Sequence, residues 1–150
     1  ERLKVHIGDG GEYVPAHRNA CDILMLDAFE DGCSVPELAT LAYYKACRAC
    51  LRAGGVLAVN FIRDEPRFET YLERIERAFD DKVLLLPCEG GVNNIVFAFK
   101  DGPVRLGIDT LKRRARALKR RYRLPFDAFL SDLLYYNGTT ANYLRIGLER

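Results

Sequence analysis

The sequence predicts an α/β fold, a doubly wound and mostly parallel sheet with helices on both faces. Apolar, β-branched runs alternate with helical segments up to about residue 100, which is the order expected of such a sheet. The run from Asp22 to Asp27 is almost unbroken in its apolar character, as in a strand covered on both faces. A length of 150 residues, with 49% hydrophobic and 29% charged residues, suits one globular domain with its own core.

Each element follows from a local pattern. Alternation over 3–7 predicts the first strand, and a short helix follows near residues 12–14. Pro36 is suited to the first turn of a helix, and Gly54 and Gly55 are suited to its end. The expected strands are 3–7, 22–27, 56–61, 82–86 and 94–99, and the expected helices are 36–53 and 65–79. Only a short turn separates the last two strands, so we expect an antiparallel hairpin at the edge of the sheet.

A composition change at Asp101-Gly102-Pro103 predicts a boundary between a domain of residues 1–101 and a C-terminal extension of residues 102–150 packed on it. Apolar residues at helical spacing predict a helix over 108–122, and a second short helix over 126–135. Between Val104 and Arg123 there are nine Lys and Arg and one Asp, although the net charge of the chain is only +2. Because the whole chain is barely basic and no aromatic residues interleave with these cations, we expect a solvated face or an acidic protein contact rather than nucleic acid.

Several classes of protein are excluded by the sequence. No apolar run approaches the roughly 20 residues of a membrane span, and no signal-peptide pattern opens the chain. Five cysteines, an odd number in mostly apolar surroundings, predict reduced thiols and a cytoplasmic protein. Cys47 and Cys50 form a CxxC inside a helix without a second pair, and His6 and His17 have no ligand spacing around them. We therefore expect no membrane segment and no metal site.

Three polar side chains occupy the ends of successive predicted strands. They are Asp9, Asp27 and Asn60. Ligands of parallel sheets bind beyond the carboxyl ends of the strands, whereas any one of these residues alone could simply cap a turn. Three in succession predict a shared site, in which a carboxylate can bond to a nucleoside or to a substrate amine.

Longer motifs resemble one family. The segment Leu3 to Gly10, the strand 22–27, Tyr43-Tyr44 and the segment Leu51 to Leu57 resemble the polyamine aminopropyltransferases, also called spermidine synthases. Asp27-Ala28-Phe29 followed by Pro36-Glu37-Leu38-Ala39-Thr40 resembles their divergent spermidine-synthase-like branch more closely. The resemblance covers about residues 2–100, whereas the loop between Phe29 and Pro36 departs from the family pattern.

The resemblance implies the fold of S-adenosylmethionine-dependent methyltransferases, truncated here at the N-terminus because the glycine-rich cofactor loop would lie upstream of Glu1. It implies transfer of an aminopropyl group from decarboxylated S-adenosylmethionine to a small-molecule amine by a homo-oligomer. Asp9 and Gly10 would contact the adenine, and Asp27 would be the catalytic carboxylate beside the amine. From their positions at strand ends, Asp27 and Asn60 are also expected to contribute to the cofactor site. Two alternatives stay open: a methyltransferase that uses S-adenosylmethionine, and a non-catalytic interaction module of the same fold.

Overall fold

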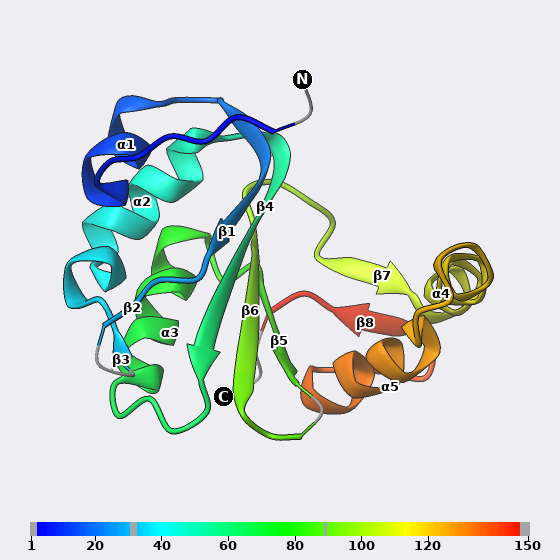
Figure 1. The fold of residues 1–150 in the computed structure, drawn as a ribbon. Coiled ribbons are helices and arrows are strands. Elements are labelled where there is room, and N and C mark those ends of the chain that lie inside the picture. The colour runs from blue at the N-terminus through cyan, green and yellow to red at the C-terminus, as the bar shows by residue number, and fades with distance from the viewer. Residues whose placement is uncertain (1–2, 31–32, 89, 148–150) are drawn as a thin grey trace.

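The protein is described by a computed structural model that covers residues 3–30, 33–88 and 90–147. Its elements form two layers of helices around a central sheet (Figure 1). In chain order they are α1 (Gly10–Ala16), β1 (Cys21–Leu26), β2 (Phe29–Glu30), β3 (Cys33–Ser34), the 3-10 helix η1 (Pro36–Ala39), α2 (Leu41–Cys50), β4 (Leu51–Ile62), α3 (Phe68–Ala78), β5 (Val83–Pro87), β6 (Asn93–Phe99), β7 (Arg105–Gly107), α4 (Ile108–Tyr122), α5 (Phe126–Tyr136) and β8 (Tyr143–Arg145).

The central sheet has the strand order β1-β4-β6-β5. β1 and β4 pair in parallel, whereas β6 is antiparallel to both of its neighbours. β1, β4 and β5 therefore run in one direction and β6 alone runs against them. This confirms the predicted α/β class and the antiparallel hairpin, in which β5 is the edge strand and β6 lies inside the sheet.

The strands bury alternate residues on opposite faces. One face, which includes Leu57, Val59 and Phe61 of β4, packs against α2 and α3 in the larger apolar cluster. The other face of the hairpin, which includes Leu84, packs against Leu144 and the tail elements in a second cluster. Alternation with a period of two is the expected consequence of strand geometry. Helices lie on both sides of the sheet (Figure 1). The prediction that the strand 22–27 is covered on both faces is wrong, because Ile23 and Met25 of β1 are 65% and 76% exposed on the side away from α2 and α3.

The predicted strand at 3–7 is wrong. These residues have no regular secondary structure, and Leu3, Val5 and Ile7 are 72%, 75% and 99% exposed. A strand needs a neighbouring backbone to pair its N–H and C=O groups, and none of the described strands pairs with this segment. The alternation of apolar residues therefore shows that this segment is suited to a strand, but it does not show that another strand is available to pair with it.

The predicted helix 36–53 is divided into η1 and α2. Thr40 separates the two, and its hydroxyl oxygen accepts a hydrogen bond of 3.1 Å from the backbone N–H of Tyr43, as an N-cap residue does. α2 then ends at Cys50, because Leu51 already pairs with Cys21 as the first residue of β4. The strand therefore begins five residues before the predicted start at Val56.

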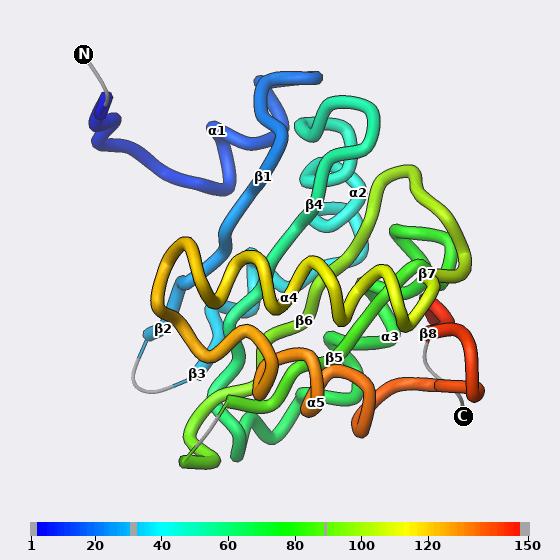
Figure 2. Tube along the Cα trace, turned by 90° about the vertical axis from the view of Figure 1, so that its right-hand side faces the viewer, coloured from blue at the N-terminus to red at the C-terminus, as the bar shows by residue number. Residues whose placement is uncertain are grey.

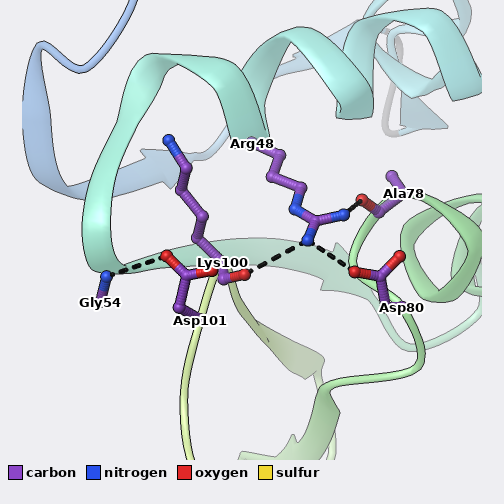
Figure 3. Close-up of polar contacts among 6 residues, drawn as sticks. All are labelled: Arg48, Gly54, Ala78, Asp80, Lys100 and Asp101. Atoms are coloured by element: carbon purple, nitrogen blue, oxygen red, sulfur yellow. Dashed lines mark hydrogen bonds and ion pairs between the residues drawn. The ribbon is translucent and has the colours of Figure 1, made fainter.

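Arg48 of α2 ties three segments together at the end of the sheet where β4 begins (Figure 3). Its guanidinium donates to the carbonyl of Ala78 at 3.0 Å, to the carboxylate of Asp80 at 2.6 Å and to the carbonyl of Lys100 at 3.4 Å. The hydrogen bond from Arg48 is the main cause that holds the pKa of Asp80 below its ordinary value. This network fixes the ends of α2, α3 and β6 relative to one another.

The tail helices agree with the prediction in position. α4 packs on α5, and α5 packs on β5, so α4 is the outermost layer (Figures 1 and 2). Ile108 and Ala115 of α4 are buried, but Tyr122, the last member of the predicted apolar stripe, is 52% exposed. Among the helices of the described residues, none has the length and apolar character needed to cross a membrane.

Asn137 joins the tail to the edge of the sheet. Its side-chain oxygen accepts from the backbone N–H of Leu85 at 2.8 Å, and its amide group donates to the carbonyls of Leu85 and Leu133 at 2.7 Å each. Asn137 is 7% exposed, so removal of its side chain would leave buried backbone groups without partners. We expect Asn137→Ala to lower the free energy of unfolding by about 2–4 kcal/mol, which a urea titration would measure.

The control for this prediction is Asn142→Ala, which removes an exposed asparagine of the same tail. It should change the free energy of unfolding by less than about 0.5 kcal/mol. An equal effect of the two substitutions would contradict the role given to Asn137.

Candidate functional site

Asp27 and Asn60 come together at the carboxyl end of the parallel strand pair. Leu26 of β1 lies opposite Val59 of β4 in the sheet register, so the next residue of each strand reaches the same edge. The side-chain amide of Asn60 donates a hydrogen bond of 2.9 Å to Oδ1 of Asp27. Asp27 is exposed and Asn60 is half-buried, so the carboxylate faces solvent and the amide supports it from the sheet. The second carboxylate oxygen of Asp27 is left to meet a ligand.

Asn60 also presents an acceptor that no described protein atom satisfies. Its Oδ1 is buried and has no hydrogen-bond partner in the protein. A buried polar atom without a partner is uncommon, because it costs about 1–3 kcal/mol. Asn60 lines a pocket of about 20 Å³ that extends under Ala28 toward Leu38 and Tyr44. That volume has room for one water molecule, so a larger ligand must lie over the open edge of the sheet.

Asp9 does not lie at a strand end, because residues 3–7 form no strand. It is instead the N-cap of α1, where its carboxylate accepts a hydrogen bond of 2.7 Å from the backbone N–H of Gly11. Gly10 follows as the first residue of α1, and its carbonyl accepts a hydrogen bond of 3.3 Å from the hydroxyl of Tyr43. The structure thus brings Asp27 and Asn60 into contact, and it positions Asp9 and Gly10 on a separate element that packs against α2.

The loop after Asp27 is fixed by Glu65, a residue that the sequence did not single out. The carboxylate of Glu65 accepts hydrogen bonds from the backbone N–H of Ser34 at 2.8 Å and of Arg67 at 3.2 Å. Burial alone would raise the pKa of Glu65, but these hydrogen bonds hold it below its ordinary value. No sequence signal linked the two ends of this contact, because Ser34 and Glu65 are 31 residues apart.

We expect Glu65→Gln to lower the free energy of unfolding by about 1–3 kcal/mol at neutral pH, because an amide cannot replace both acceptor oxygens. The folded-state pKa of Glu65 lies below the ordinary 4.5, so its stabilisation is present above pH 4.5 and is lost as the pH falls through the lower folded value. Urea titrations should show the difference between the two proteins shrinking below pH 4.5. Glu69→Gln, at an exposed site of α3, is the matched control, and a difference that did not depend on pH would contradict the assignment.

The geometry and the pKa values of the described thiols do not favour a catalytic role for them. All five cysteines are free, and Sγ of Cys21 lies 4.0 Å from Sγ of Cys50. Burial raises the pKa of Cys47 to about 12 and that of Cys21 to about 11, which disfavours the thiolate. Within residues 3–30, 33–88 and 90–147, no group of three or more His, Cys, Asp or Glu residues is placed to hold a metal ion. A larger hollow of about 1000 Å³ lies beside Asp80 and Gly147, and none of the predicted site residues lines it.

Known proteins share much of this sequence. The model of the spermine/spermidine synthase domain matches residues 1–80. The polyamine aminopropyltransferase of Neisseria meningitidis is 29% identical over 146 residues, which is 97% of this chain and 56% of that protein. That of Chromobacterium violaceum is 30% identical over 138 residues, which is 92% of this chain and 53% of that protein. The chain therefore spans about half the length of these curated relatives.

Solved structures resemble the fold as well. The spermidine synthase from Thermotoga maritima matches with a TM-score of 0.64 and 23% identity, over 88% of this chain and 46% of that one. Human methyltransferase-like protein 13, in complex with SAH, matches with a TM-score of 0.69 and 27% identity, over 83% of this chain and 61% of that one. The first likeness supports the fold, and the match of the family model to more than half of the chain decides the family. The chain belongs to the spermine/spermidine synthase family.

Proposed function

We propose that this protein takes part in the transfer of an aminopropyl group from decarboxylated S-adenosylmethionine to a small-molecule amine. The observation that carries the proposal is the contact between Asp27 and Asn60 at the carboxyl ends of β1 and β4, in a chain of this family. Relatives that align with almost the whole chain are named polyamine aminopropyltransferases. A spermidine synthase of similar fold is described in complex with the transition-state analogue AdoDATO.

The role proposed for Asp27 follows from the chemistry of amines. An alkyl amine is mostly protonated at neutral pH and attacks carbon only after it loses a proton. In the reaction its nitrogen bonds to the propyl carbon next to sulfur, the carbon–sulfur bond breaks and methylthioadenosine leaves. The exposed carboxylate of Asp27 can attract the cationic amine and accept the proton as the bond forms. The hydrogen bond from Asn60 fixes the orientation of that carboxylate.

The described residues fit part of such a ligand. The orphaned Oδ1 of Asn60 lines a pocket with room for one water molecule, through which it can be linked to an N–H or O–H donor of a bound ligand. The half-exposed Gly10 and the exposed Asp9 supply acceptors beside α2, which we assign to the adenine. No residue of this sequence is identifiable as the partner of the ribose or of the sulfonium group. We therefore propose that the 150-residue chain provides the adenine and amine sides of the site.

A pair of measurements tests the proposal. Calorimetric titration with methylthioadenosine would compare the 150-residue chain with the gene product that includes any polypeptide encoded upstream of Glu1. Two or three missing charge-assisted hydrogen bonds should make the short chain bind at least about a hundredfold more weakly. The longer product should release methylthioadenosine from decarboxylated S-adenosylmethionine when putrescine or spermidine is present. If no methylthioadenosine is released with either amine, the proposed reaction is refuted.

A second candidate function is methyl transfer from S-adenosylmethionine. The likeness to human methyltransferase-like protein 13 in complex with SAH favours it, since that match combines 27% identity with a TM-score of 0.69. The same assay separates the two, because methyl transfer requires the carboxylated donor and releases SAH instead of methylthioadenosine. Turnover of S-adenosylmethionine, with no turnover of the decarboxylated donor, would select this alternative.

A further inference from the structure

α4 carries a concentrated positive charge on its solvent side. Six cationic side chains of this helix and its C-cap occupy about one third of the helix circumference, given 3.6 residues per turn. We call them the basic face: Lys112, Arg113, Arg116, Lys119, Arg120 and Arg123. All six are exposed, and α4 lies in the outermost layer of the molecule (Figure 2). The rise of about 1.5 Å per residue places the first and last of them about 16 Å apart.

The described protein leaves this charge almost unneutralised. Lys119 forms an ion pair of 2.6 Å with Asp127, and Arg113 donates to the neutral hydroxyl of Thr110 at 3.0 Å. The other four members of the basic face have no ion pair with any described residue. Cations four residues apart on a helix repel each other by about 0.2–0.5 kcal/mol per pair. The helix therefore bears a small cost in stability that an anionic partner would remove.

The net charge of the chain conceals this surface. Residues 104–123 contain nine Lys and Arg and one Asp, so the remaining chain has 14 Lys and Arg against 20 Asp and Glu, a net charge of −6. Interactions between exposed charges are screened beyond about 8–10 Å at physiological salt. A ligand on the basic face therefore experiences the local positive charge and little of the distant acidic excess. The low overall charge is a weak argument against a polyanionic partner.

The chemistry of the basic face favours one class of partner over the others. The centre of a protein–protein interface is depleted in charged residues, and this face offers no apolar centre. Ile108 and Ala115, the buried members of the apolar stripe of α4, are already packed inside the protein and are not available to enter a lipid surface. Binding to a duplex backbone needs neither an apolar centre nor aromatic stacking, because phosphates are neutralised by Lys and Arg alone. Measured along the duplex axis, about 16 Å corresponds to about five phosphates of one strand.

We propose that the basic face of α4 binds the phosphate backbone of double-stranded nucleic acid without sequence preference. Arginine predominates in the face and can bind phosphate through two parallel hydrogen bonds. The site is separate from Asp27 and Asn60, and it does not depend on the proposed transfer reaction.

The test uses the 150-residue chain and a fluorescent DNA duplex of about 20 base pairs, in an anisotropy titration from about 50 to 200 mM salt. The variant is Lys112→Gln/Arg116→Gln/Arg120→Gln, which removes three exposed cations without ion pairs and keeps good helix formers. Binding should weaken at least about tenfold at the lower salt concentration, and the salt slope should fall by about 2–3. The matched control, Arg18→Gln/Lys45→Gln/Arg77→Gln, removes the same charge from exposed sites elsewhere and should bind nearly as the unmodified chain does.

Circular dichroism and thermal melting must first establish that both variants fold. Absence of duplex binding by the unmodified chain at the lower salt concentration would overturn the proposal. Equal weakening in the two variants would also overturn it, since total charge alone would then explain the binding. A salt-sensitive dimer that only the α4 variant loses, measured by light scattering without any DNA binding, would assign the face to a second copy of the chain instead. Stronger binding to a single strand than to the duplex would contradict the choice of duplex.

Discussion

Asp27→Asn is expected to lower kcat for aminopropyl transfer by about two to four orders of magnitude, the usual contribution of a positioned general base. An amide has nearly the shape of the carboxylate, and its oxygen can still accept the hydrogen bond from Asn60. The substitution therefore removes the negative charge and the proton acceptor while it keeps the local geometry. Binding of methylthioadenosine should change much less than kcat, because that product lacks the amine. The measurements are initial rates and calorimetric titrations on the gene product that includes any polypeptide encoded upstream of Glu1.

Asp22→Asn is the matched control for this prediction. Asp22 lies in β1, near the end opposite to the one that Asp27 follows, where it is exposed and forms an ion pair of 3.0 Å with Arg52. An exposed pair of this kind contributes little to stability, and its loss should leave the rate of transfer almost unchanged. If Asp27→Asn kept full activity, Asp27 would have no part in the mechanism. If both substitutions lowered the rate equally, the effect would be one of overall charge.

Much of the fold could be predicted from local patterns. β1 lies within one residue of its predicted bounds and pairs in parallel with β4, because an apolar run of this length favours a strand. Its predicted burial on both faces is wrong, since Ile23 and Met25 are exposed. α4 was predicted over the range that the structure has, since its apolar residues recur at helical spacing. The short pairs β2–β3 and β7–β8 were missed, because strands of two or three residues carry no periodicity. The wrong strand at 3–7 has the opposite cause: the pattern was clear, but pairing depends on residues distant in sequence.

The candidate site divides in the same way. Asp27 and Asn60 were singled out because each follows or ends an apolar run, and the parallel register of β1 and β4 then brings them into contact. Their hydrogen bond depends on a strand offset that no local pattern specifies. Asp9 was assigned to the same edge through a strand that does not form, so its grouping with Asp27 stays a proposal. The role of Glu65 could not be predicted from the sequence, because it consists of hydrogen bonds to backbone N–H groups, which any residue can supply.

Phe61→Ala is expected to be the most destabilising of these substitutions, by about 3–5 kcal/mol in the free energy of unfolding. Phe61 is 1% exposed, and its ring lies edge-on to that of Phe68 at 5.4 Å and roughly parallel to that of Tyr71 at 6.2 Å. Truncation removes these contacts and opens a cavity between β4 and α3 that the surrounding side chains can only partly fill. For a chain of this length the melting temperature should fall by about 6–20 °C.

Two further variants make this prediction specific. Phe129→Ala removes a phenylalanine that is 39% exposed on α5, and it should cost less than about 1 kcal/mol. Phe61→Leu keeps most of the buried volume and should lie between the two. Phe61 lies in β4 directly after Asn60, and the chain continues from β4 to Glu65, whose carboxylate binds Ser34 in the loop after Asp27. Phe61→Ala should therefore also weaken the hydrogen bond between Glu65 and Ser34. An unchanged melting temperature in Phe61→Ala would mean that β4 and α3 are not packed together in solution as described.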